Sequence, residues 1–437
     1  MQWRMLFATM IGYTLFYFMR KNFSFAMPGL QQDCSISKSM LGNFLFWGGI
    51  VYGLSKFVNG IVGDKVNPKK MFCFGLAVCV LINVAFGFAP QIAGTSTSAL
   101  AWTFGLLLVL NQLFQGTGFP PCAKLIAFWV PPKELATKMS VWNTSHSIGG
   151  GLVAKICGVI MGLGAVGAAN QGVGMWRWCF WSMAILGALG LLLMLFWLPG
   201  TPKDEGLPDL PGTETPPPTN SSAPTLTTHN SKLTTHNSSL HMVFLNPVIW
   251  MLGFINFTIN AVRALVADWG PTMLQESKGF DPSGTGTVIM LFEFAGIAGM
   301  LFAGWATDRF FGGRAPRLCV FLMALTAALF AAFWLLPAGL TGAAALCLGG
   351  FCLYGPQALT GVTATNLATK RFAGTAIGFV SLFSYLGVSV AGKVCGNLAQ
   401  SSGGWRLPVL VMVAVASVGA ALFACLWRTR AHAYGEE

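Results

Sequence analysis

Apolar segments of roughly 20 to 30 residues, separated by short polar loops, recur along the chain. A helix of about 20 mainly apolar residues spans the hydrocarbon core of a bilayer. The pattern therefore predicts about twelve membrane-spanning helices. We place them at residues 4–30, 40–63, 71–90, 99–129, 138–165, 175–198, 246–275, 286–306, 316–337, 341–368, 374–399 and 404–427.

One long polar stretch interrupts this pattern between the sixth and seventh spans. Residues 199–245 are rich in Pro, Thr, Ser and Asn, a composition typical of a disordered linker. We therefore expect a six-helix bundle at 1–198, a disordered cytoplasmic linker at 199–245 and a second six-helix bundle at 246–437.

Composition and charge agree with a multi-pass, all-α membrane protein. Of the 437 residues, 54% are hydrophobic and 9% are charged, whereas a soluble chain carries about 25% charged residues. The net charge of +12 is spread over short loops, which is typical of membrane topology and disfavours a nucleic-acid partner. The 11 cysteines are scattered without a CxxC pair, so neither zinc, a disulfide framework nor any other cofactor is expected.

Basic residues favour one set of loops. The loops after spans two, four, eight, ten and twelve carry them, whereas the opposite loops hold almost none beyond Lys38 and Lys278. By the positive-inside rule, both termini and the linker are predicted to be cytoplasmic. The basic residues concerned are Lys65, Lys69, Lys70, Lys133, Lys138, Arg309, Arg314, Arg317, Lys370, Arg371, Arg428 and Arg430.

The two halves of the chain echo each other. Asp64-Lys65 follows the second span, and Asp308-Arg309 occupies the corresponding place after the eighth. Parallel six-helix repeats about an axis along the membrane normal are a transporter architecture, with substrate bound near the midplane between the halves. An acid and a base in these two loops resemble the major facilitator superfamily, whose fold we expect here.

Arg20 and Arg263 lie at matching places in the first span of each half. An arginine at membrane depth costs about 2.5 to 3.5 kcal/mol or more, so such residues usually face a wet cavity or a charged partner. The rigid guanidinium fork suits phosphate. Two guanidiniums would repel each other in an empty site, and a bound dianion would neutralise them. The alternatives are snorkelling or pairing with a carboxylate, although Asp268 does not share the helical face of Arg263.

Lys56 and His146 are two further candidates within spans. Lys56 either lines a substrate channel or snorkels to the interface. His146 either lends a proton or hydrogen bond to a phosphate ester or is a core histidine bonded to a carbonyl group.

Two other lysines, Lys155 and Lys393, lie in spans five and eleven. Each either lines an anion pathway or snorkels, and we include Lys393 among the candidate substrate-binding residues. The buried acids Asp268 and Glu293 are expected to offset this positive charge by pairing, whereas Lys21 is interpreted as a snorkelling residue.

Polar-tipped aromatic residues complete the candidate site, each as a packing residue or a ligand. Tyr13 and Tyr17 share the helical face of Arg20, and Trp142 lies four residues before His146. The other tyrosines of this kind are Tyr52, Tyr354 and Tyr385.

Several motifs together resemble the organophosphate:phosphate antiporter family, which includes glycerol-3-phosphate and hexose-phosphate transporters. They are YFMRKNFSFAMP, YGLSKFVNGIVGDKVNPKK, QGTGFPPCAK, VWNTSHSIGGG, AVRALVADWGPTML and LYGPQAL, and the likeness spans nearly all of the chain except 199–245. The resemblance implies that Arg20 and Arg263 clamp phosphate and that Lys56 and His146 assist. It also places Tyr13, Tyr17, Tyr52, Trp142, Tyr354 and Tyr385 at cavity positions.

Within that family, LNPVIW, VRALVADWG and WNTSH look most like the hexose-phosphate branch. The expected function is exchange of a sugar phosphate, such as glucose 6-phosphate, for inorganic phosphate by a monomer in a bacterial inner membrane. Asn260 is a further candidate substrate-binding residue. It stands where relatives usually have tyrosine, so the resemblance specifies the phosphate part of the ligand and not the organic part.

Three other functions are weighed against this one. A glycerol-3-phosphate antiporter fits the same motifs. A hexose-phosphate sensor fits the same scaffold, although Val388 replaces the aspartate that we expect in a sensor. A membrane phosphatase lacks support, because the sequence shows no metal-ligand cluster or paired acids and only Ser145 and Ser147 flank His146. The chain is therefore not expected to be an enzyme.

Overall fold

The computed structural model describes residues 1–94, 96–166, 174–208, 246–367 and 373–428, and within these ranges all regular elements are helices. The first half of the chain holds α1 (Gln2–Cys34), α2 (Lys38–Lys65), α3 (Pro68–Gly87), α4 (Ala89–Ala93), α5 (Thr97–Gln115), α6 (Phe119–Trp129), α7 (Pro132–Asn143), α8 (Ser145–Val166), α9 (Trp176–Trp197) and η1 (Lys203–Glu205). The second holds α11 (Pro247–Ala267), α12 (Gly270–Lys278), α13 (Pro282–Phe310), α14 (Ala315–Leu335), α15 (Leu340–Leu367), α16 (Ala373–Ser401) and α17 (Arg406–Cys425).

The described residues contain 11 helical segments that are long and apolar enough to cross a membrane. Two of these segments are broken helices, because α5 continues into α6 and α7 into α8. With its 33 residues α1 is long enough to be a further span, but its composition is more polar. The prediction of about twelve spans is therefore confirmed.

Capping residues explain where several of the helices begin. Ser37 accepts a hydrogen bond from the backbone of Met40 at the start of α2, and Asp281 accepts two at the start of α13. Asn67 caps α3 in the same way, with Pro68 as the first helical residue. These side chains satisfy backbone N–H groups that have no partner within the helix.

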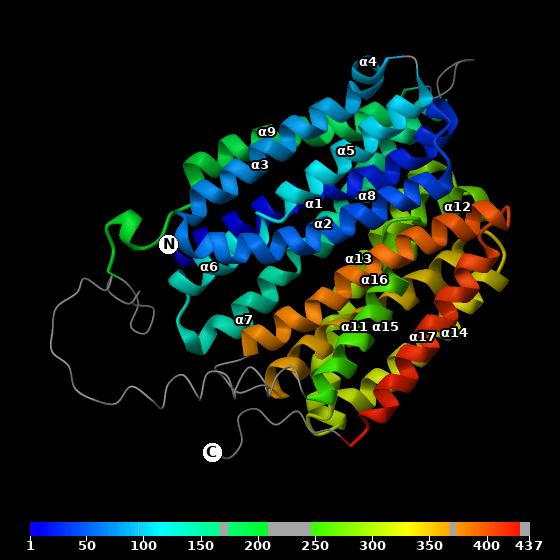
Figure 1. Cartoon of the computed structure of the whole chain (residues 1–437). Helices are drawn as coiled ribbons and strands as arrows, with labels where there is room; N and C mark the ends of the chain where they lie inside the picture. The colour runs from blue at the N-terminus through cyan, green and yellow to red at the C-terminus, as the bar shows by residue number, and fades with distance from the viewer. Residues whose placement is uncertain (95, 167–173, 209–245, 368–372, 429–437) are drawn as a thin grey trace.

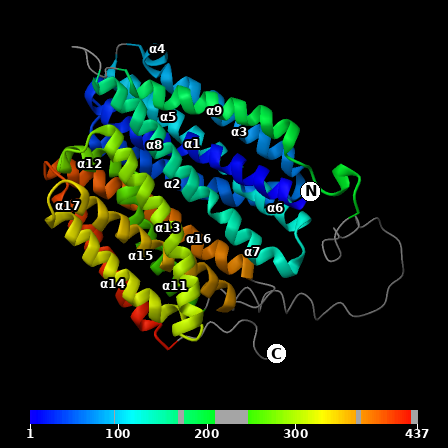
Figure 2. The same ribbon diagram turned by 180° about the vertical axis from the view of Figure 1, so that it is seen from behind.

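Helices α1 to α9 form one bundle and α11 to α17 form the other, so the two halves of the sequence lie side by side (Figures 1 and 2). The bundles meet along two seams, one between α2 and α16 and one between α8 and α13. We call the end that carries the α2–α3 loop and η1 the linker face, and the opposite end, where α12 lies, the far face.

Glycines let the seams close tightly toward the far face. A Cβ atom on Gly286 of α13 would lie 2.4 Å from the carbonyl oxygen of Ala154 on α8. On α2, a Cβ atom on Gly49 would lie 2.2 Å from the Ser389 hydroxyl of α16. Such small residues allow helix backbones to approach each other closely within a membrane.

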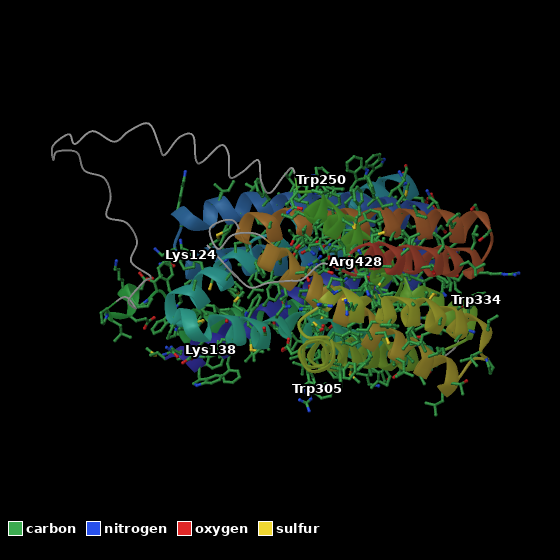
Figure 3. All side chains as sticks on the ribbon, turned by 90° about the horizontal axis from the view of Figure 1, so that it is seen from below. Lys124, Lys138, Trp250, Trp305, Trp334 and Arg428 are labelled. Atoms are coloured by element: carbon green, nitrogen blue, oxygen red, sulfur yellow. The ribbon has the colours of Figure 1, made fainter. Side chains whose placement is uncertain are left out.

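Toward the linker face the two bundles separate (Figures 1 and 2). Gly361 of α15 and Gly60 of α2 would place a Cβ atom with no neighbour within 4 Å. Figure 3 shows Lys124 and Lys138 toward this end of the molecule and Trp334 at the opposite end. The structure is thus closed at the far face and open at the linker face.

The first residues after α9 form an ordered turn at the linker face. The indole of Trp129 donates to the carbonyl oxygen of Gly200 at 2.8 Å. Asp204 accepts from the backbone and hydroxyl of Thr201 at 2.8 and 2.9 Å and from Asn67 at 3.1 Å. The hydrogen bond from the Thr201 backbone is the main reason that the pKa of Asp204 lies below its ordinary value.

The rest of the predicted linker, residues 209–245, lies outside the described residues. The same holds for Lys370, Arg371 and Arg430 among the basic loop residues. The disordered linker therefore stays a prediction, and so does the cytoplasmic position of both termini.

Candidate functional site

A cavity of about 320 Å³ lies between the two bundles. Both halves of the chain contribute to its wall, as expected for a site between repeats. Of the candidate residues named from the sequence, those on the wall are Tyr13, Tyr17, Arg20, Tyr52, Lys56, His146, Asn260, Arg263 and Tyr385.

Arg20 reaches the cavity from α1 and rests against aromatic rings. Its guanidinium carbon lies 3.8 Å from the ring centroid of Tyr52 and 5.4 Å from that of Tyr17. Both are cation–π distances. No carboxylate pairs with Arg20 among the described contacts. Among the described residues, the positive charge of Arg20 is therefore not neutralised by a carboxylate.

Arg263 reaches the same cavity from α11 and does have a carboxylate partner. Its Nη2 atom lies 3.1 and 3.2 Å from the two carboxylate oxygens of Glu293 on α13. The hydroxyl of Tyr354 donates to the same carboxylate at 2.6 Å, and the guanidinium lies 4.6 Å from the Tyr354 ring centroid. Pairing with a carboxylate, an alternative in the sequence analysis, thus holds for Arg263, through Glu293 rather than Asp268.

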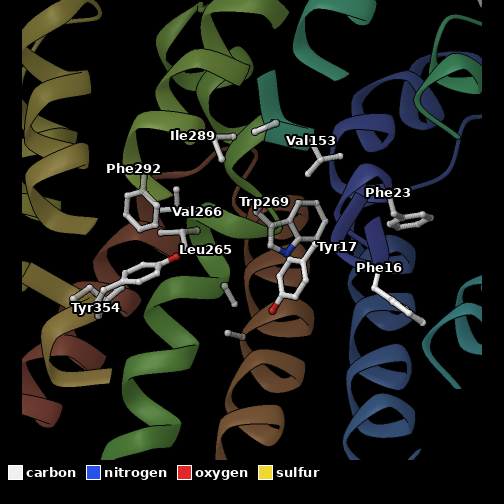
Figure 4. Close-up of a cluster of buried hydrophobic side chains, with 14 of the residues drawn as sticks. Phe16, Tyr17, Phe23, Val153, Leu265, Val266, Trp269, Ile289, Phe292 and Tyr354 are labelled. Atoms are coloured by element: carbon white, nitrogen blue, oxygen red, sulfur yellow. The ribbon is translucent and has the colours of Figure 1, made fainter. Parts of the chain in front are cut away.

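Tyr354 supports Arg263 from behind and does not line the cavity. Its side chain is fully buried and packs edge-on against Phe292, with ring centroids 5.9 Å apart. Figure 4 shows Phe292 and Tyr354 on the second bundle, opposite Phe16 and Tyr17 on α1. The cavity position that the resemblance implies for Tyr354 is therefore not what the structure shows: the residue lies behind the wall and contacts Glu293 and Arg263.

Lys56 links the two bundles at the cavity wall. Its Nζ atom donates to the hydroxyl of Tyr385 on α16 at 2.7 Å and lies 3.9 Å from the ring centroid of Phe119. Lys56 therefore points into the cavity rather than toward the membrane interface, and its contact with substrate stays a prediction.

His146 and Trp142 flank the short break between α7 and α8. The Nδ1 atom of His146 contacts the backbone carbonyl of Asn143, while its buried Nε2 atom has no partner in the described part of the chain. Trp142 packs against Tyr13 with the two rings tilted and their centroids 4.8 Å apart, and it does not line the cavity. His146 thus lies on the cavity wall with one buried ring nitrogen that has no partner among the described residues, whereas Trp142 packs against Tyr13.

Lys21 corrects one interpretation made from the sequence. It does not snorkel but lines the cavity, and its Nζ atom lies 2.5 Å from a carboxylate oxygen of Asp268. The ion pair joins α1 to the loop after α11, on the far-face side of the arginines. The prediction that Asp268 and Glu293 pair with nearby cations is confirmed.

Lys155 and Lys393 lie on the seams rather than on the cavity wall. Lys155 of α8 donates to the hydroxyl of Thr287 on α13 at 2.8 Å. The Lys393 ammonium lies 5.2 Å from the ring centroid of Phe46 on α2. Including Lys393 among substrate-contacting residues is therefore not supported by this cavity.

Several neutral polar residues on the cavity wall were missed by sequence reasoning. Amides and hydroxyls within a span are also common in helix packing, so they give a weak signal on their own. Only their convergence in three dimensions marks them. These residues are Asn143, Asn256, Gln357, Ser381 and Ser384.

The charges at the cavity leave a positive excess. Four cationic side chains face two carboxylates, which gives a formal charge of +2 with His146 neutral. The cationic residues are Arg20, Lys21, Lys56 and Arg263, and the carboxylates are those of Asp268 and Glu293. The described residues hold no group of three or more His, Cys, Asp or Glu that could bind a metal ion. The site is therefore built to attract an anion.

The sequence and the fold match known transporters. The family model of the Major Facilitator Superfamily matches residues 9–392. The solved D-xylose-proton symporter superposes with a TM-score of 0.77 over 99% of each chain at 14% identity, which supports the fold alone.

Relatives with higher identity narrow the family. The glycerol-3-phosphate transporter of Bacillus subtilis is 33% identical over 96% of this chain and 90% of its own length. A probable hexose phosphate transport protein of Chlamydia trachomatis is 32% identical over 97% and 91%. The membrane sensor protein UhpC of Escherichia coli is 34% identical over 87% and 82%. The chain therefore belongs to the major facilitator superfamily and, within it, to the organophosphate:phosphate antiporter family.

Proposed function

We propose that this protein exchanges a sugar phosphate, with hexose 6-phosphate as the best candidate, for inorganic phosphate across a bacterial inner membrane. The observation that carries the proposal is the cavity between the bundles, with Arg20 and Arg263 on opposite walls and a formal charge of +2. The proposal includes cytoplasmic termini and a monomeric carrier that performs no chemical reaction on its cargo.

The charge of the cavity matches the charge of the cargo. A phosphate monoester carries about −1.5 to −2 at neutral pH and offers oxygen acceptors. The guanidinium donors of Arg20 provide a bidentate contact to phosphate. The Nε atom of Arg263 is buried and without a partner among the described residues. A dianion between the two arginines would therefore be held from both bundles.

This geometry suggests why transport is an exchange. Closing the linker face around an empty cavity would enclose uncompensated positive charge in a medium of low dielectric constant, where repulsion is strong. A bound dianion removes that cost and bridges α1 and α11, which favours closure. Because either cargo carries the phosphate group, inorganic phosphate serves on the return step.

Between the cavity and the far face, ion pairs join the bundles in the present conformation. Lys21 pairs with Asp268, and Lys38 of α2 lies 2.7 Å from Glu276 of α12. Alternating access requires these pairs to separate when the far face opens. The first pair is largely buried and lies at the cavity, so ligand charge acts directly on its stability.

Counterflow in proteoliposomes tests the function. Vesicles loaded with unlabelled glucose 6-phosphate are expected to take up labelled inorganic phosphate, and vesicles without internal phosphate or ester are expected to take up almost none. Uptake that does not need an internal phosphate compound would contradict exchange.

A sensor is the second candidate, because UhpC is similarly related. It predicts binding of hexose phosphate by the purified protein without counterflow, so measuring both in one preparation separates the two functions. Glycerol 3-phosphate in the same vesicles tests the remaining alternative.

A further inference from the structure

Neutral polar side chains gather on one wall of the cavity, on the second bundle. They come from three helices, α11, α15 and α16. The first bundle contributes four aromatic residues to the opposite wall, together with cationic side chains, His146 and Asn143. The polar residues are Asn256, Asn260, Gln357, Ser381 and Ser384, and the aromatic ones are Tyr13, Tyr17, Tyr52 and Phe119.

The two asparagines are held in fixed orientations. The amide of Asn256 donates to the carbonyl oxygen of Val380 at 3.1 Å and to the Ser384 hydroxyl at 2.5 Å. The amide of Asn260 donates to the backbone and side-chain oxygens of Asn256 at 2.8 and 3.0 Å. These bonds occupy the amide nitrogen of Asn260 and leave its side-chain oxygen as an acceptor at the cavity wall.

Gln357 has an unsatisfied acceptor on the same wall. Its side-chain oxygen is buried and has no hydrogen-bond partner among the described residues. A buried carbonyl oxygen without a donor is destabilising, so its presence beside a cavity indicates a site for a donor group. A sugar hydroxyl supplies such a donor, whereas the fully ionised phosphate group of an ester has no O–H and does not.

The polar wall also extends away from the phosphate position. Along α11, Asn260 and Asn256 precede Arg263 by three and seven residues, or about 4.5 and 10.5 Å along the helix axis. A six-carbon sugar held by its phosphate at Arg263 would extend farther along α11, past Asn260 toward Asn256, than a three-carbon polyol would. Its apolar ring face can lie against the aromatic residues opposite.

We propose that Asn260 and Gln357, with Asn256 holding Asn260 in position, form a hydroxyl-binding subsite that selects the polyhydroxylated, six-carbon part of the cargo. The proposal rests on the proposed function, in that the arginines hold the phosphate. It assigns specificity to the second bundle: the arginines bind any phosphate compound, and the polar wall distinguishes among the esters.

Binding to the purified, detergent-solubilised protein tests the subsite by calorimetry with glucose 6-phosphate, 2-deoxyglucose 6-phosphate and inorganic phosphate. Gln357→Met and Asn260→Ala are each expected to weaken glucose 6-phosphate binding roughly five- to tenfold, the effect of one lost hydrogen bond. Phosphate affinity should fall much less. At least one variant should discriminate less between glucose 6-phosphate and an ester lacking one hydroxyl, with the 3-deoxy and 4-deoxy esters extending the series.

Gln112→Met is the matched control. Gln112 of α5 also has a buried, unpartnered side-chain oxygen, but it lies outside the cavity wall. The Gln112→Met substitution should leave the affinities for glucose 6-phosphate, its deoxy analogues and inorganic phosphate unchanged. Equal losses for phosphate and ester in both cavity variants, or unchanged discrimination across the deoxy series, would overturn the subsite. Counterflow by the wild-type protein is a separate measurement. If the protein binds with this selectivity but shows no counterflow, the subsite proposal stands and the proposed exchange is contradicted.

Discussion

The two arginines of the site occupy different electrostatic environments despite their matching places in the repeats. Arg20 lies against Tyr52 and Tyr17 without a carboxylate, whereas Arg263 is held by Glu293. The sequence predicted both residues, because an arginine within a span is rare and costly. It did not predict the asymmetry, because Glu293 is distant in the sequence and only the fold brings it to Arg263.

Replacing Arg20 with lysine should remove the bidentate contact but keep the charge. We expect the Kd for inorganic phosphate to rise between about tenfold and a hundredfold, as for a hydrogen bond to a charged group. Calorimetry on the purified protein measures this. Arg177→Lys is the control, since Arg177 also lies 5.5 Å from an aromatic ring centroid, that of Trp176, but is outside the cavity. Equal Kd values for Arg20→Lys and wild type would exclude the clamp.

Replacing Glu293 with glutamine should raise the formal charge of the cavity from +2 to +3. We expect phosphate to bind at least about fivefold more tightly, which corresponds to the roughly 1 kcal/mol between unit charges about 4 Å apart even in water. Counterflow should slow, because a bound dianion no longer neutralises the cavity. Glu276→Gln, a partly exposed carboxylate at the far face, should change phosphate affinity little. Weaker phosphate binding in Glu293→Gln would contradict this electrostatic account.

At the scale of helices, the glycines of the two seams determine how closely the bundles meet. Gly286 and Gly158 face each other across α13 and α8, where side chains larger than hydrogen have no room. Close backbone contact of this kind makes the closed far face a well-packed interface.

Gly286→Val should therefore destabilise the closed far face. Its Cβ atom would lie 2.4 Å from the carbonyl oxygen of Ala154, and overpacking of this kind costs about 1 to 3 kcal/mol. We expect a shift toward the form that is open at the far face, measured as longer distances by double electron–electron resonance between spin labels on the two bundles. We also expect slower counterflow. Gly304→Val on the same helix meets nothing within 4 Å and should leave the distances unchanged.

The turn after α9 gives a prediction about pH. Hydrogen bonds from Thr201 and Asn67 lower the pKa of Asp204, so the folded turn favours its ionised form. The ionised Asp204 carboxylate should stabilise the turn fully above the unfolded-state pKa of about 3.9. This stabilisation should be lost as the pH falls through the lower pKa of the folded state. Asp204→Ala should remove it at neutral pH and speed Thr201 amide exchange roughly threefold to tenfold.

Hydrogen exchange read by mass spectrometry measures this effect at peptide level. Asp281→Ala, which removes a helix cap at the far face, should leave exchange at Thr201 unchanged. An equal change in both variants would indicate general destabilisation rather than loss of this turn.

The spans themselves were predictable, whereas much of the cavity wall was not. Apolar length placed the helices, and the two arginines marked the site. The prediction that Lys21 snorkels was wrong, because its partner Asp268 lies on the other bundle and only the fold brings the two together. Gln357 gave no signal at all, since an amide in a span acquires meaning only from an unpaired oxygen beside a cavity.

At the scale of the whole molecule, the described residues pack closely between the bundles toward the far face and leave space beside the cavity toward the linker face. Gly361 lies on the cavity wall and has open space beside it. A water-soluble reagent should therefore reach this position through the linker face and not through the far face.

Gly361→Cys in a Cys425→Ser background should react with a membrane-impermeant maleimide added on the linker side. Saturating glucose 6-phosphate should slow the reaction several-fold by filling the cavity. Ser402→Cys, at an exposed position just after α16, should react only from the opposite side and be insensitive to ligand. Inside-out and right-side-out vesicles provide the two directions, and reaction of both cysteines from the same side would contradict the topology.

The formal charge of the cavity has a consequence for energetics in the cell. Each elementary charge that crosses a membrane potential of 100 mV exchanges about 2.3 kcal/mol with that potential. A carrier matched to one dianion in each direction returns to its starting state without having moved net charge. Voltage then does no work on the complete cycle, and the two concentration gradients alone set the direction of net flow.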